Sequence, residues 1–140
     1  MREIKFRLWN LKGEYMFSNN NEEILLNIDG SSLWFHKVHY YDGTDLLEID
    51  DFEIMQYTGL KDSNGVEIYE GDIVRATSQG DWGNFEVKWR QDGSPQWILY
   101  PAWKSGKIWQ LHGMLNADGE YQDTVKIIGN IYENPDLLED

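Results

Sequence analysis

The sequence predicts a mainly β protein with little helix, in which N-terminal strand hairpins precede a small SH3-like or similar partly open β-barrel half. Two observations predict this class. Short runs rich in β-branched and aromatic residues recur between Gly, Asn, Asp and Pro, and no window of helical length shows a 3.6-residue apolar stripe. We treat residues 1–140 as one unit with a soft division into a hairpin region, 1–54, and a barrel-like half, 55–140.

The N-terminal region is expected to form two hairpins and a following strand. The alternation in "REIKFRLW" predicts a first strand, and a turn through Gly13 lets residues 15–17 pair back onto it. The runs "EILLNIDG" and "SLWFHKVHYY" predict a second pair, joined at Asp29–Gly30. "FEIMQYTG" then predicts a strand of mixed burial.

The stretch "MQYTGLKDSNGVEIYEGDIV" contains two turns. Asn64 and Gly65 in the first are suited to positive φ. Gly71 in the second permits a backbone that a side chain would obstruct. Ile68 and Tyr69 lie between the turns and are expected to close over the barrel end. We therefore interpret this stretch as a connector that wraps onto the barrel.

The C-terminal half is expected to supply five more strands, "DIVRATS", "NFEVKWR", "QWILYPAW", "GKIWQLHG" and "TVKIIGNIY". Each is a β-rich run bounded by turn-forming residues, at the spacing of a sandwich or barrel. Only the terminal "NPDLLED" predicts a helical turn, with Asn134 placed to cap it and Pro135 at its first position.

Composition excludes several classes of protein. There is no cysteine, so disulfides, zinc ribbons and thiolate nucleophiles are absent. The 12 basic and 25 acidic residues leave a net charge of −13, which repels phosphate backbones and anionic lipids. The N-terminus does not resemble a signal peptide, and no apolar run approaches the ~20 residues of a membrane-spanning helix. We expect a cytoplasmic protein with no membrane partner.

The acidic residues are unevenly distributed. Six of them fall in a segment without any base: Asp42, Asp45, Glu48, Asp50, Asp51 and Glu53. This segment lacks the ligand order of a calcium loop, so we interpret it as a solvated loop. Between residues 85 and 109, bases outnumber acids. Two such regions are able to attract each other in a head-to-tail assembly.

The polar residues form no catalytic motif. In a strand, His36 and His39 point to opposite faces, and together with His112 they make no ligand pattern. Neither a P-loop nor a Gly-x-Ser-x-Gly motif is present. Carboxylates are abundant enough for a hydrolase pair, but sequence does not define their separation. We expect no enzymatic activity, no metal and no cofactor.

The aromatic residues offer better candidates for binding. Five tryptophans crowd one stretch beside basic residues: Trp82, Trp89, Trp97, Trp103 and Trp109. Trp89 alternates with Phe85 and Val87, which predicts that it lies in the core. Trp82 lies between two glycines and is expected to be exposed. The candidate partner-binding residues are Trp82, Lys88, Arg90, Trp103, Lys104, Asp42 and Asp45.

Three blocks carry a family resemblance: "REIKFRLWN", "MQYTGLKDSNGVEIYEGDIV" and "IIGNIYENPDLL". They resemble the YopX family, small proteins of phages and prophages in mainly Gram-positive bacteria, and they occur in that family's order. Leu8 and the Trp9–Asn10 pair depart from its pattern, and residues 18–50 and 77–124 lie outside the blocks. The resemblance implies a mostly β fold with a barrel-like C-terminal half, a phage setting and self-association. It implies no catalytic residues.

These observations favour a non-catalytic phage or prophage accessory protein. We expect a protein-interaction or self-assembling module, a homo-oligomer with an unknown phage or host partner. Alternatives are a nucleic-acid-associated barrel that uses its aromatic and basic residues, disfavoured by net charge, and an acidic decoy of a nucleic-acid-binding host protein. A hydrolase is the weakest alternative.

Overall fold

The computed structural model describes residues 4–17, 22–26, 33–37, 44–47, 51–78, 80–91, 95–104, 106–111 and 124–139. Contacts divide the chain into two compact units, residues 6–55 and residues 1–5 with 56–140. Strands dominate the described part of the chain, which confirms the predicted mainly β class.

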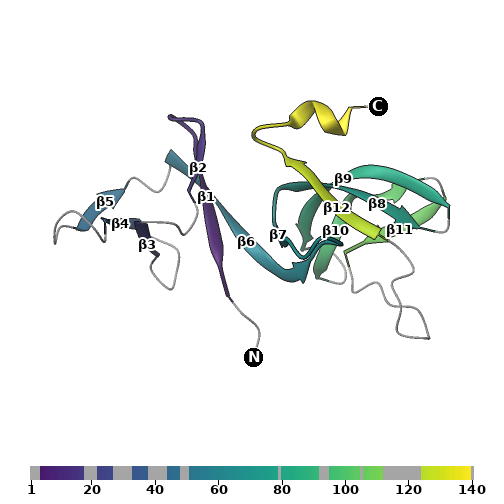
Figure 1. Cartoon of the computed structure of the whole chain (residues 1–140), viewed down its shortest axis with the longest axis horizontal. Coiled ribbons are helices and arrows are strands. Elements are labelled where there is room, and N and C mark those ends of the chain that lie inside the picture. Colours follow the sequence, from purple (N-terminus) through teal and green to yellow (C-terminus); the bar gives the residue numbers. More distant parts are fainter. Residues whose placement is uncertain are drawn as a thin grey trace. The chain divides into compact units, whose positions relative to one another are not determined.

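The first unit contains both predicted hairpins. β1 (Phe6–Asn10) pairs antiparallel with β2 (Tyr15–Phe17). β3 (Glu22–Leu26) pairs with β4 (Leu33–Lys37), and β5 (Thr44–Leu47) adds a third strand to this sheet (Figure 1). The buried apolar residues described in this unit are Leu8, Trp9 and Met55.

β5 corrects the interpretation of the acidic segment as a loop. Its backbone pairs with β4, with Leu46 opposite Trp34 and Leu47 opposite Leu33. Two adjacent leucines opposite large apolar residues favour strand pairing over solvation. The acidic residues on both sides of these leucines favoured the interpretation as a loop, although Thr44–Leu47 form a short strand.

The second unit contains the larger sheet and the connector that precedes it. Its strands are β6 (Phe52–Lys61, from Gln56 onward), β7 (Glu67–Tyr69), β8 (Asp72–Ser78), β9 (Asp81–Arg90), β10 (Gln96–Lys104), β11 (Lys107–Gln110) and β12 (Thr124–Asn130).

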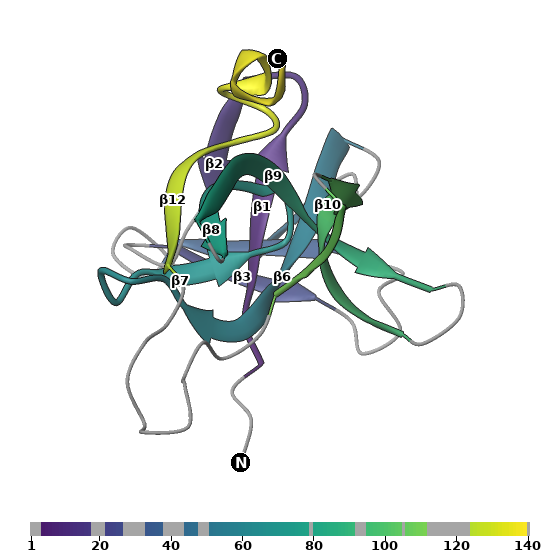
Figure 2. The ribbon, with the colours of Figure 1, turned by 90° about the vertical axis from the view of Figure 1, so that its right-hand side faces the viewer.

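The five C-terminal strands form one antiparallel sheet in the order β11-β10-β9-β8-β12. The sheet curls into a half-barrel (Figure 2), which confirms the predicted partly open barrel. Its core is apolar and aromatic, and it consists of Ile68, Val74, Ala76, Phe85, Val87, Leu99, Trp109, Leu111 and Val125. The Phe85 and Trp109 rings pack with centroids 4.6 Å apart. Burial of this cluster supplies the main driving force for folding the unit.

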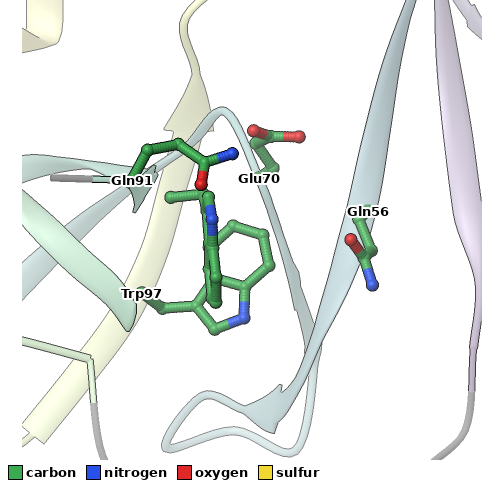
Figure 3. Close-up of a pocket in the computed structure, with 5 residues that line it drawn as sticks. Gln56, Glu70, Gln91 and Trp97 are labelled. Carbon is green, nitrogen blue, oxygen red and sulfur yellow. The ribbon is translucent and has the colours of Figure 1, made fainter. Parts of the chain in front are cut away.

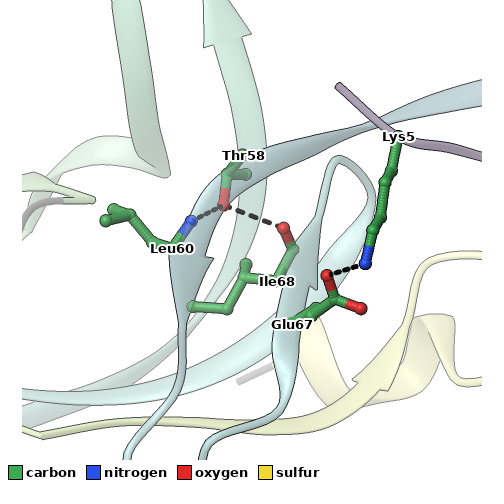
Figure 4. Close-up of polar contacts among 5 residues, drawn as sticks. All are labelled: Lys5, Thr58, Leu60, Glu67 and Ile68. Carbon is green, nitrogen blue, oxygen red and sulfur yellow. Dashed lines mark hydrogen bonds and ion pairs between the residues drawn. The ribbon is translucent and has the colours of Figure 1, made fainter. Parts of the chain in front are cut away.

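An irregular ribbon of β6 and β7 leads into the barrel. The register shifts within the ribbon, where Gly59 has a φ of +89°. Beside this bulge, Thr58 Oγ1 donates to the Ile68 carbonyl at 2.8 Å and accepts from the Leu60 N–H at 3.2 Å (Figure 4). The hydroxyl thereby satisfies backbone groups beside the disrupted ladder. An ion pair of Lys5 and Glu67, with Nζ and Oε2 2.8 Å apart, lies along the same ribbon.

The first two residues of the "DSNG" turn bind the backbone of β12. Asp62 is 7% exposed, and its carboxylate accepts from the N–H groups of Asn64, Val66 and Ile127 at 2.9 to 3.0 Å. Ser63 donates from both N–H and Oγ to the Val125 carbonyl. A turn 62 residues away in sequence is thus tied to the last barrel strand.

Gly65 has the positive φ expected of it, at +81°, whereas Asn64 does not, so that part of the prediction is wrong. The Gly65 N–H donates to the Asp62 carbonyl at 2.9 Å. The loop is therefore closed by one left-handed glycine, and Asn64 does not share that conformation.

The second turn has the geometry that the sequence predicts. Gly71 has a φ of +86°, its N–H donates to the Val87 carbonyl, and its carbonyl accepts from the Ile131 N–H, both at 2.9 Å. The buried Asp72 accepts the Tyr69 N–H at 2.8 Å. The turn is thereby joined to β9 on one side and to the end of β12 on the other.

The chain ends in a single 3₁₀ turn, η2 (Pro135–Leu138). Pro135 lies at its start as predicted, but the Asn134 side chain does not cap it; its Oδ1 instead accepts from the Asn130 N–H at 3.3 Å. The four-residue η2 turn has little need of a side-chain cap. The N–H of Asn130 at the end of β12, in contrast, needs a hydrogen-bond acceptor, which Asn134 provides. The Asn84 side-chain amide donates to the Leu137 carbonyl at 2.9 Å, which attaches η2 to β9.

Candidate partner-binding site

The outer face of β8–β10 presents aromatic rings that are paired with cations. Trp82 is 61% exposed, and the Arg75 guanidinium lies 4.9 Å from its ring centroid. Arg75 Nε also donates to Asn84 Oδ1 at 3.1 Å, since the two residues face each other across β8 and β9. Gly83, Phe85 and the other inward positions of β9 are buried, so this face is the outer one by strand alternation. The exposure expected for Trp82 is confirmed.

A second pair lies further along the same face. Lys88 Nζ lies 4.7 Å from the ring centroid of the exposed Tyr100. Glu86 lies directly opposite Tyr100 in the ladder. Burial raises the pKa of Glu86 above its ordinary value, and the nearby Lys88 offsets part of this rise.

Trp103 lies at the end of β10, beyond an irregularity in the β10–β11 ladder, and is 64% exposed. The preceding Ala102 has a φ of +66°. A bulge of this kind redirects the side chains that follow it. We call Arg75, Trp82, Lys88, Tyr100 and Trp103 the outer aromatic surface.

Lys104 takes part in the fold more than in this surface. Its Nζ lies 5.4 Å from the ring centroid of the buried Phe85, and its carbonyl accepts the Trp109 indole N–H at 3.0 Å. Arg90 is half-buried and lies opposite Gln96. Asp42 lies outside the described residues, and Asp45 is described only by its place in β5, opposite Phe35. Of the candidates from the sequence, Trp82, Lys88 and Trp103 therefore belong to the outer aromatic surface. Arg75 and Tyr100 belong to it as well, although they were not among those candidates.

The core position predicted for Trp89 is wrong, because its side chain is 38% exposed. Phe85 and Val87 are buried as expected, but Trp89 is two residues further along β9, near the strand end. There the inward face opens into a pocket. The Trp89 and Trp97 rings meet edge to face, with centroids 5.1 Å apart and planes at 71°.

This pocket has a volume of about 390 Å³ and is lined by Gln56, Glu70, Trp89, Gln91 and Trp97 (Figure 3). We call it the tryptophan pocket. The Glu70 N–H donates to the Gln56 carbonyl at 2.9 Å, which places the turn before β8 beside β6. The signal for it in the sequence was the spacing of Trp89 and Trp97 around "RQDGSPQ", since a hairpin centred there makes them partners. Glu70, Gln56 and Gln91 had no comparable signal.

The described residues include no group of three His, Cys, Asp or Glu side chains arranged to hold a metal ion. The side chains of His36, His39 and His112 lie outside the described part. No helix among the described residues has the length and apolarity that crossing a membrane requires.

Comparison with known proteins identifies relatives for nearly the whole chain. A family model described as YopX protein matches residues 5–139. The crystal structure of protein EF1440 from Enterococcus faecalis is similar, with 27% identity, a TM-score of 0.59, and coverage of 99% of this chain and 100% of that one. The X-ray structure of YopX from Bacillus subtilis shares the fold, with 23% identity, a TM-score of 0.59 and the same coverage. No curated protein matches. Because the family model spans almost the entire chain, this protein belongs to the YopX family.

Proposed function

We propose that this protein is a non-catalytic interaction module of a phage or prophage. It acts in the cytoplasm of the bacterial host, self-associates, and binds a phage or host protein. The observation that carries the proposal is the outer aromatic surface, where Trp82 and Trp103 remain largely exposed on a folded barrel.

Physical reasons support this reading of the surface. Tryptophan, tyrosine and arginine are the residues that most often anchor protein interfaces. Leaving large rings in water forgoes roughly 2 kcal/mol of burial for each, which a partner recovers by covering them. The flanking Arg75 and Lys88 hold their rings by cation–π contacts, so part of the surface is ordered before a partner arrives.

Self-association is tested by measuring native mass over a range of protein concentration. We expect the wild type to form dimers or larger closed assemblies, and Trp82→Ala with Trp103→Ala to shift it towards the monomer. Each truncated anchor should cost about 1–2 kcal/mol of association free energy, or roughly five- to thirtyfold in affinity. Glu53→Ala is the matched control, since Glu53 is exposed on β6 and lies outside the outer aromatic surface. A wild type that stays monomeric at every concentration contradicts self-association.

The heterologous partner is tested by affinity capture from induced lysogens or infected cells. The wild type should retain a specific protein that the Trp82→Ala, Trp103→Ala variant loses, while the Glu53→Ala control keeps it. If the wild type, the double variant and the control all retained the same proteins, the outer aromatic surface would not be the binding site for this partner.

The pairing of Arg75 with Trp82 favours one further candidate, binding of single-stranded nucleic acid. Rings beside cations stack bases, and both pairs lie on one sheet face. The net charge of −13 opposes this role. Salt-sensitive binding of an oligonucleotide that is lost in Trp82→Ala would establish it, and its absence near ~50 mM salt would dispose of it.

A further inference from the structure

We propose that the tryptophan pocket binds a proline-rich segment of a partner protein. Two indole rings and two side-chain amides make up most of its lining, from Trp89, Trp97, Gln56 and Gln91. The pocket is separate from the outer aromatic surface, because Trp89 and Trp97 continue the inward face of the barrel whereas Trp82 lies on the outward face. It is therefore a second site, and it does not depend on the first.

Hydrogen-bond donors are in excess among the polar groups of this lining. Each indole has one N–H and no acceptor, and each glutamine amide has two N–H groups beside one oxygen. Within the described part of the chain, no hydrogen bond engages the side-chain amides of Gln56 and Gln91. Glu70, the fifth lining residue, already has an interaction partner, so its carboxylate takes no part in the proposed binding. The other four residues fit a ligand with an apolar surface, many acceptors and few donors.

A proline-rich segment has this combination of groups. Proline has no backbone N–H, so a run of prolines presents carbonyl oxygens as acceptors without backbone donors. These oxygens are not used within the segment, because a polyproline II helix has no internal hydrogen bonds. The pyrrolidine rings supply apolar surface of the kind that packs in aromatic-lined grooves. The net charge of −13 repels acidic chains, so the residues that flank the prolines are neutral or basic.

The shape of the pocket suits a narrow, extended chain. The Trp89 and Trp97 rings meet edge to face, with centroids 5.1 Å apart and planes at 71°, and so form a corner that a small ring can enter. Figure 3 shows Gln56 and Gln91 on different sides of the Trp97 ring. The volume of about 390 Å³ is near the lower end of the ~300–1,000 Å³ range of ligand pockets, and it admits a few side chains of such a segment.

The protein and the segment both have much of the bound conformation before they meet. The Glu70 N–H donates to the Gln56 carbonyl at 2.9 Å, which holds the turn before β8 beside β6. Trp89 and Trp97 are direct partners in the β9–β10 ladder. A polyproline II helix is already extended when free. Binding therefore costs little conformational entropy on either side.

The experiment follows the indole N–H resonances of the ¹⁵N-labelled protein during titration with a blocked, uncharged peptide, Gly-Pro-Pro-Pro-Pro-Pro-Gly. The matched peptide has alanine in place of every proline and is also uncharged, so general charge attraction acts on neither. Trp89→Phe and Trp97→Phe assign the two resonances. We expect saturable shifts of these resonances with the proline peptide, and at least about tenfold weaker binding of the alanine peptide.

Single-residue variants test the rings and the donors separately. Trp97→Leu removes one ring and should weaken binding of the proline peptide about tenfold. Gln56→Glu keeps the shape of the side chain but replaces its amide donor by a carboxylate, and should weaken binding about three- to tenfold. The controls are Gln110→Glu, at an exposed position of β11, and Trp82→Leu, on the outer aromatic surface. Both should leave binding unchanged.

Circular dichroism and thermal melting show whether each variant is folded. If the loss of a ring in Trp97→Leu unfolds the barrel, Gln56→Glu still tests the pocket, because it changes only the polar end of one side chain. Its comparison with Gln110→Glu then decides whether the donor at this position matters.

Several results would overturn the proposal. These are the absence of saturation up to ~10 mM proline peptide, equal binding of the alanine peptide, and equal effects of Gln56→Glu and Gln110→Glu. Shifts of the Trp89 and Trp97 resonances by cellotriose, a neutral sugar, but not by the proline peptide would assign the pocket to carbohydrate instead. None of these results bears on the outer aromatic surface, whose own test uses other residues.

Discussion

At the scale of single residues, Gly71 is the position where backbone conformation matters most to the barrel. Its φ of +86° lies in the left-handed region and it is buried. Its N–H donates to Val87 of β9, and its carbonyl accepts from Ile131, the residue that follows β12. Sequence reasoning identified this glycine because the turn needed a residue without a side chain.

We expect Gly71→Val to lower the free energy of unfolding by at least ~2 kcal/mol, since a β-branched residue is strained at positive φ and the site has no solvent-facing room. Urea denaturation measures the loss. Gly80→Val is a useful comparison, because Gly80 has a similar φ of +87° but open space around its Cβ position, so strain alone acts there. Equal losses in both variants would contradict a packing contribution at Gly71.

Glu86 gives a residue-scale prediction about pH. Burial raises the pKa of its carboxyl, so the folded state holds this proton more tightly than the unfolded chain does. The ionised carboxylate therefore costs stability at neutral pH. That cost disappears as the pH falls through the raised folded-state pKa towards 4.5, the ordinary value for the unfolded chain.

Glu86→Gln should accordingly stabilise the protein at pH 7 and lose this advantage at about pH 4, where the wild-type carboxyl is largely protonated in the folded state. Urea denaturation of both proteins at each pH measures the difference in their free energies of unfolding. The contributions of the other carboxylates are the same in both proteins and cancel in this difference. A variant less stable than wild type at pH 7 would mean that the attraction to Lys88 outweighs the burial.

At the scale of elements, local patterns located most strands but not their partners. The five barrel strands and both N-terminal hairpins were recognisable because alternation and turn residues are local properties. β5 was missed because acids flank its two leucines, and β7 because it is a three-residue strand between turns. The docking of the "DSNG" turn onto β12 joins segments 62 to 65 residues apart, which no local pattern reports.

Asp62 is the residue on which this docking depends. Asp62→Ala should cost about 2–4 kcal/mol of unfolding free energy, since three backbone N–H groups lose a buried charged acceptor. Asn64→Ala, in the same turn but exposed, should change stability by less than about 0.5 kcal/mol. Hydrogen exchange at Val66 and Ile127 localises the effect, and unchanged protection there in Asp62→Ala would argue against this role.

At the scale of the whole molecule, the excess of acids over bases opposes compaction through self-repulsion. We expect the melting temperature to rise as NaCl is increased from ~10 to ~150 mM, because the Debye length falls to ~8 Å. Glu53→Lys with Glu139→Lys removes two negative charges and adds two positive ones, which changes the net charge from −13 to −9, and it should reduce this salt dependence. Equal salt dependence in both proteins would show that net charge is not its cause.

Local sequence patterns were enough to predict the β class, the position of most strands, the glycine-dependent turns and the family resemblance that the comparison confirms. Each depends on residues close together in the chain, where side-chain alternation and φ preferences act directly. Tertiary structure alone decided that Trp89 opens into a pocket with Gln56 and Glu70, and that Lys104 lies over Phe85 while Arg75 lies over Trp82. Burial at a strand end depends on which distant segments cover it, and alternation along one strand contains no information about those segments.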